Sequence, residues 1–174
     1  LIDLFGHDSV CVAGPKDTCI LRPTAIQKLE EWNTALNGGR CEGLAALSTR
    51  FLLRMDSPST FQTNASSVSA LSQDNAKLNS AVVYWWATQF LTEVSDRAAT
   101  SRTKSPLQLV DDLIQGLANG VGYTVGLYFG SSGHAVTPFA VTQRGKEFII
   151  HVYDNNFPGV RKEIAVDGST NSWS

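Results

Sequence analysis

The spacing of apolar residues changes once along this chain, and the change limits the class of fold. Before about residue 120, apolar residues recur at the three- and four-residue steps of a helix, as in the set Ile26, Leu29, Trp32 and Leu36. After residue 120 the pattern is that of short strands separated by Gly-containing turns. Helices followed by antiparallel strands predict an α+β fold.

The expected elements follow from this pattern. We expect helices at 23–36, 41–55, 76–96 and 106–118, and strands at 123–129, 134–141, 147–154 and 161–166. Of the 174 residues 43% are hydrophobic and 17% are charged, enough for one folded core. We therefore predict a single domain over 1–174, with an irregular segment at 1–22, a helical part at 23–120 and an antiparallel sheet at 121–174.

Charge and motifs argue against several classes of function. The formal net charge of −2 gives no electrostatic case for nucleic acid, and no apolar run approaches the roughly 20 residues of a membrane span. There is no P-loop, no GxGxxG after a strand, no GxSxG elbow and no HExxH. We predict no cofactor and no metal. Because the chain begins at Leu1 without an initiator Met, we expect it to be part of a larger polypeptide.

Two of the three cysteines are close in sequence. Cys11 and Cys19 flank a turn-rich segment, and their spacing is too wide for a zinc-binding pair. We predict a disulfide that closes a small loop, which favours a secreted or extracytoplasmic protein. The alternative is two reduced, buried thiols in a cytosolic protein. With the disulfide formed, Cys41 is left over as a reactive thiol or an intermolecular link.

Cys41 lies at the expected start of the second helix, in the run Asn37-Gly38-Gly39-Arg40-Cys41-Glu42-Gly43. A helix N-terminus lowers the pKa of a thiol, and its N–H groups can hold an oxyanion. We expect Gly43 to leave room beside the thiol. The alternative for Cys41 is a buried structural cysteine, since cysteine is among the most buried residue types.

His134 is the candidate base, because it begins a strand next to the flexible Ser131-Ser132-Gly133 loop. A two-residue turn at Arg144-Gly145 places His134 opposite Asn155, and a turn one residue longer places it opposite Asp154. Asp154 can then orient the imidazole, with Asn155 as the second candidate. The alternative for Asp154-Asn155-Asn156 is a plain Asx-rich turn without a catalytic role. His151, in mid-strand, is expected to be a surface or cross-strand residue.

Three short stretches together resemble the papain-like cysteine peptidase superfamily in a divergent, bacterial-type form. They are Gly39-Arg40-Cys41-Glu42-Gly43 at a helix start, Gly133-His134-Ala135-Val136 on a strand, and Tyr153-Asp154-Asn155-Asn156 ending the next strand. The resemblance implies an N-terminal helical lobe that carries the cysteine, packed against a C-terminal antiparallel sheet. It assigns Cys41 as nucleophile, His134 as general base and acid, and Asp154 as the orienting residue.

The chain departs from the family at the oxyanion donor. The family usually has a Gln six residues before the cysteine, where this chain has Ala35. Asn37 in the turn and Gln27 in the preceding helix are the candidates for that role. The resemblance predicts a thiol protease or related hydrolase that acts on a protein or peptide through a Cys-His-Asp triad. A deamidase, a transglutaminase-type toxin domain and a non-catalytic binding module of a larger protein remain alternatives.

Overall fold

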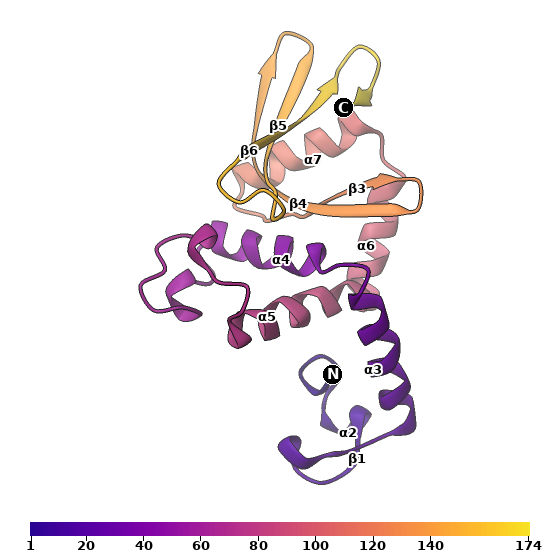
Figure 1. Cartoon of the computed structure of the whole chain (residues 1–174). Helices are drawn as coiled ribbons and strands as arrows, with labels where there is room; N and C mark the ends of the chain where they lie inside the picture. The colour runs from indigo at the N-terminus through magenta and orange to yellow at the C-terminus, as the bar shows by residue number, and fades with distance from the viewer. The chain divides into compact units, whose positions relative to one another are not determined.

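The computed structural model describes all residues from Leu1 to Ser174, and the chain forms two compact units, Leu1–Arg40 and Cys41–Ser174. Helices dominate the chain up to residue 118, and an antiparallel sheet follows, so the α+β class is confirmed (Figure 1). None of its helices combines the length and apolar character that a membrane crossing needs. The single papain-like domain over 1–174 stays a prediction.

The first unit contains a small disulfide-bonded substructure followed by one long helix. Its elements are α1 (Ile2–Phe5), α2 (His7–Val10), β1 (Cys11–Ala13), the 3-10 turn η1 (Lys16–Thr18), β2 (Ile20–Leu21) and α3 (Pro23–Leu36). β1 pairs with β2, and Cys11 is bonded to Cys19, which confirms the predicted disulfide. The prediction that residues 1–22 are irregular is wrong. The disulfide and the buried side chains of Val10, Cys11 and Ala25 supply enough local order for short elements.

The second unit begins with helices and short 3-10 turns. They are α4 (Cys41–Leu52), η2 (Pro58–Thr60), η3 (Val68–Ala70), α5 (Ala76–Ala87), η4 (Thr88–Phe90), α6 (Thr92–Arg102) and α7 (Pro106–Ala118). The helix expected at 76–96 is interrupted, because Leu91 has extended backbone angles. Just before the break, Thr88 and Gln89 donate side-chain hydrogen bonds to the carbonyls of Trp85 and Trp86, and such bonds compete with a continuing helix.

The sheet has five antiparallel strands in sequence order. They are β3 (Val125–Phe129), β4 (Ser132–Arg144), β5 (Glu147–Tyr153), β6 (Arg161–Asp167) and β7 (Ser172–Trp173). The expected turn at Arg144-Gly145 is wrong by one residue, because Arg144 pairs with Glu147 and the turn is Gly145-Lys146. The register shifts again between Pro138 and Ala140.

The two faces of β4 pack against different helices (Figure 1). On one face, α7 covers the main core, which consists of Val110, Leu113, Val136, Ile150, Val152, Ile164 and Val166. On the other face, the Thr137 hydroxyl donates a 2.9 Å hydrogen bond to the carbonyl of Ala45 in α4. Neighbouring residues of a strand point to opposite faces, so Val136 and Thr137 fix which helix covers each side.

Gly43 serves packing between helices instead of leaving room beside the thiol, which corrects the expectation for this residue. It is buried where α4 crosses α5, and a Cβ built on it would overlap the Val82 carbonyl and lie 2.8 Å from the Trp86 Cβ. The close approach of α5 therefore depends on the missing side chain.

We predict that Gly43→Ala destabilises the protein by about 2 kcal/mol or more, as overpacked cores do. Helix propensity alone predicts the opposite, a gain of about 1 kcal/mol. Urea unfolding measures the difference, with Ala46→Gly in the same helix as the control for propensity. An unchanged or raised stability of Gly43→Ala would contradict the packing role.

We also predict that replacing both Cys11 and Cys19 by serine destabilises the first unit by about 2.5 kcal/mol, the chain-entropy value for so short a loop. Hydrogen exchange should show faster exchange at the amides of β1 and β2. The control is the oxidised wild type. Equal protection in both proteins would mean that the disulfide does not hold this substructure together.

Candidate functional site

Cys41 is the first residue of α4, and its thiol is free and partly exposed. Hydroxyl groups tie this helix to the ends of the strands. The Thr124 hydroxyl donates to Glu42 Oε1 at 2.9 Å, and the Thr49 hydroxyl donates to the Tyr123 carbonyl at 2.9 Å. With the Thr137 bond to α4, these contacts fix the helix against β3 and β4, and so fix where its N-terminus lies.

His134 and Asp154 form a hydrogen-bonded pair. The distance from His134 Nε2 to Asp154 Oδ1 is 2.7 Å, and the exposed fractions of the two side chains are 25% and 12%. A carboxylate only accepts hydrogen bonds, so Nε2 carries the proton and Nδ1 is left to exchange one. The Asn156 N–H also donates to Asp154 Oδ1, at 2.9 Å, which holds the carboxylate in place.

The pairing does not come from the ladder that the sequence predicted. β5 pairs with β4 only as far as Tyr153 opposite Thr137, so neither Asp154 nor Asn155 is a ladder partner of His134. The Asp154 side chain instead reaches His134 from the turn after β5. His134 and Asp154 are therefore neighbours, as expected, but they are not opposite each other in the pairing of β4 with β5.

Cys41 and His134 are not hydrogen-bonded to each other in this structure. By strand alternation, His134 leaves β4 on the side of Val136, whereas Thr137 leaves it on the side of α4. At His134 one edge of β4 pairs with Leu127 of β3, and the other edge carries no strand, because β5 has already ended. A contact between the thiol and the imidazole therefore has to form around this open edge.

The remaining amide candidates have other partners. Asn155 accepts a 3.2 Å hydrogen bond from the Ser48 hydroxyl of α4, and its buried Nδ2 atom has no partner. In the first unit, Gln27 donates to Glu31 at 3.1 Å, and Asn37 is the C-terminal cap of α3. The oxyanion roles of Asn37 and Gln27 and the orienting role of Asn155 stay predictions. The structure contains no group of three or more His, Cys, Asp or Glu side chains that could hold a metal ion.

Two side chains next to the candidate residues have shifted acidities. Burial raises the pKa of Glu42, with the Thr124 hydrogen bond acting in the opposite direction. Burial, followed by the charge of Asp154, raises the pKa of the Tyr153 phenol. Glu42 follows Cys41 directly, so a protonated Glu42 removes a negative charge that would oppose a thiolate there.

Sequence reasoning did not find the hydroxyl contacts of α4. Ser48 and Thr49 are both buried, although they interrupt an otherwise apolar helix face. Two hydroxyl residues in an apolar helix face could have indicated these contacts, because a buried hydroxyl needs a hydrogen-bond partner. His151 was also misjudged as a possible surface residue. It is a cross-strand residue only 2% exposed, because Phe139 stacks on its ring.

Comparison with known proteins adds no relative. A scan of protein-family models, a search of curated proteins and a search of solved structures each found no match to this chain.

We predict that Glu42→Gln makes the protein more stable at pH 7.5 and changes little at pH 4. The raised pKa of Glu42 means that the folded state favours the neutral carboxyl. The stabilisation from this carboxyl is fully present below its reference pKa of 4.5, and it is lost as the pH rises through the pKa in the folded state. Urea unfolding at several pH values measures this, with exposed Glu93→Gln as the control. Parallel pH profiles for wild type and Glu42→Gln would rule out the buried carboxyl as the cause.

Proposed function

We propose that this protein is a cysteine-dependent hydrolase that cleaves peptide or amide bonds through an acyl-enzyme. The observation that carries the proposal is the 2.7 Å hydrogen bond between His134 and Asp154. It lies on a sheet packed against the helix that begins at Cys41. The resemblance of the three short stretches to papain-like peptidases supports the same roles.

In the proposed reaction the Cys41 thiolate attacks the carbonyl carbon of the substrate. The proton taken from the thiol by His134 Nδ1 passes to the leaving amine as the C–N bond breaks, and a thioester remains on Cys41. Water then gives a proton to His134 and attacks the thioester, which releases the acid and restores the thiol. Asp154 keeps the proton on Nε2 and stabilises the charged ring.

The helix start contributes electrostatically. The first N–H groups of an α-helix have no partner within the helix, and they favour negative charge nearby. At the start of α4 they would stabilise both the thiolate and the oxyanion of the tetrahedral intermediate. The reaction also requires the His134 ring and the first turn of α4 to meet around the open edge of β4.

Two finer assignments rest on the same chemistry. Transfer of the acyl group to an amine instead of water gives a transglutaminase, and attack on a side-chain amide gives a deamidase. We propose a protein or peptide as substrate and a secreted or extracytoplasmic location, which the Cys11–Cys19 disulfide supports.

A second candidate function is a non-catalytic binding module built on the same scaffold. The observation that favours it is the lack of a hydrogen bond between Cys41 and His134. A structural Cys41 and a catalytic Cys41 differ in the state of the thiol, so its reactivity separates the two candidates.

We predict that iodoacetamide alkylates Cys41 of the native protein rapidly at about pH 6.5. The reason is that a catalytic thiol is ionised at a pH well below about 8.5, the pKa of a free cysteine. His134→Ala should slow this reaction about tenfold or more, and Asp154→Asn should slow it less. Intact mass over time measures the rate.

The control is His7→Ala, which removes a histidine of the other unit and should leave the rate unchanged. Labelling of Cys41 only after the protein unfolds would favour the binding module. An equal alkylation rate in wild type and His134→Ala would show that His134 does not activate the Cys41 thiol.

A further inference from the structure

The turn after β5 carries the carboxylate that binds His134, but strand pairing does not fix this turn. The ladder between β4 and β5 ends at Tyr153, directly before Asp154. Backbone hydrogen bonds from the N–H groups of Phe157 and Val160 set the shape of the turn but not its place on the sheet. Residues 156–160 are exposed. Another contact has to hold Asp154 within reach of the imidazole.

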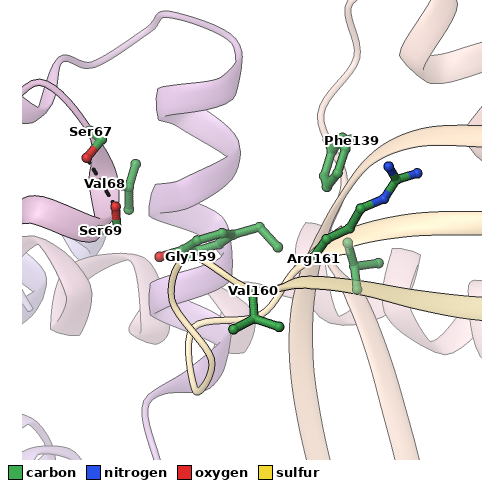
Figure 2. A pocket seen from close by; sticks show the side chains of 9 residues that line it. Ser67, Val68, Ser69, Phe139, Gly159, Val160 and Arg161 are labelled. Carbon is green, nitrogen blue, oxygen red and sulfur yellow. Dashed lines mark hydrogen bonds between the residues drawn. The ribbon is translucent and has the colours of Figure 1, made fainter.

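Close packing does not hold the far end of this turn, because an apolar pocket lies beside it. The volume of the pocket is about 300 Å³, and it is lined by Ser67, Val68, Ser69, Phe139, Val152, Tyr153, Gly159, Val160 and Arg161. Figure 2 shows Ser67, Val68 and Ser69 on one side and Phe139 and Arg161 on the other. Atoms that line a void lose packing contacts on that side. The end of the turn therefore contributes little to the position of its beginning.

A hydrogen bond from α4 holds the beginning of the turn. The Ser48 hydroxyl, on a side chain buried in the interface, donates to Asn155 Oδ1 at 3.2 Å. Asn155 follows Asp154, whose carboxylate binds His134, and precedes Asn156, whose N–H donates to the same carboxylate oxygen. Ser48 thus ties α4 to the residue next to the carboxylate.

The helix α4 therefore acts on the candidate base in two ways. Through the carbonyl of Ala45 it binds Thr137, which fixes the backbone of β4 near His134. Through Ser48 and Asn155 it holds the turn that carries the carboxylate, and the carboxylate sets the orientation of the imidazole. The first contact places the base, and the second orients its ring.

Stability alone does not account for an amide at position 155. The Nδ2 atom of Asn155 is buried and has no hydrogen-bond partner. An unpartnered buried donor costs at least as much free energy as one neutral hydrogen bond contributes. A side chain without the amide would avoid this cost, so the contact with Ser48 points to a role in positioning.

We propose that Ser48 and Asn155 are positioning residues, which hold Asp154 and, through it, the ring of His134 in one orientation relative to Cys41 at the start of α4. The effect on Cys41 rests on the proposed function. The effect on the imidazole does not, because it requires no catalysis.

The test is ¹⁵N NMR of the full chain labelled at histidine, which shows which imidazole nitrogen carries the proton. The spectra are recorded at about pH 8.5, well above the pKa of about 6.5 of a free histidine. Wild type should show the proton of His134 on Nε2 alone. In Ser48→Ala and in Asn155→Ala the carboxylate is no longer held, so we expect a mixture of the Nε2–H and Nδ1–H tautomers.

Two further variants set the limits of this measurement. Asp154→Ala removes the acceptor and gives the spectrum of a ring without its partner. Phe157→Ala should match wild type, because Phe157 is an exposed residue of the same turn.

Alkylation of Cys41 by iodoacetamide at about pH 6.5 measures the effect on the thiol. Ser48→Ala and Asn155→Ala should each slow the reaction about threefold, within the range of one neutral hydrogen bond. The double variant should be no slower than either single variant, because both changes remove the same contact. Asn155→Ala should keep or raise the midpoint of urea unfolding, since it also removes the unpartnered donor.

A single Nε2–H tautomer in both variants would overturn the proposal. Slow alkylation in His134→Ala but not in Ser48→Ala or Asn155→Ala would also overturn it. Mixed tautomers, with an alkylation rate that neither these variants nor His134→Ala changes, would support the positioning of the ring and contradict the proposed function.

Discussion

The packing of α4 between α5 and the sheet is the constraint on which the candidate site depends. The absence of a side chain at Gly43 lets α5 approach one side of this helix, and Thr137 binds the Ala45 carbonyl from the other. These contacts are short and directional, so the helix has little freedom to slide along β4. The position of Cys41 relative to the strands follows from contacts one turn further along the helix.

The turn after β5 lies beside two features of the sheet, the hydrogen-bonded pair of His134 and Asp154 and an apolar pocket. Asp154, at its start, holds His134, while Tyr153, Val160 and Arg161 at its two ends line the apolar pocket. Tyr153 lines the pocket, whereas its neighbour Asp154 binds His134. The seven-residue connection between β5 and β6 thus supplies both a partner for the candidate base and part of the lining of the pocket.

The sequence predicted best those features that local chemistry determines. Pro23 and Ser105-Pro106 mark true helix starts, and Ser105 forms a capping box with Gln108. The Cys11–Cys19 disulfide followed from the turn-rich segment between the two cysteines and from a spacing too wide for a zinc-binding pair. The proximity of His134 and Asp154 was also predictable, because residues near the open ends of one hairpin must lie close together.

Other features depend on contacts that the pattern does not contain. The turn lies one residue later than predicted, at Gly145-Lys146, where Gly145 takes a positive φ of 62°. A second shift of the strand register lies between Pro138 and Ala140. The burial of His151 depends on Phe139, which the strand pattern alone does not place over it. The position of Cys41 relative to His134 depends on how α4 packs across the sheet. The spacing of apolar residues in the sequence does not determine that packing.

Trapping of the covalent intermediate tests the central claim most directly. The protein is mixed with a p-nitrophenyl ester of an acylated amino acid, quenched in acid within milliseconds to seconds, and digested for mass spectrometry. The account predicts an acyl group on Cys41 that forms quickly in wild type, forms slowly in His134→Ala, and is absent in Cys41→Ala. An acyl group found elsewhere, or one that forms on Cys41 at the same rate without His134, would contradict it.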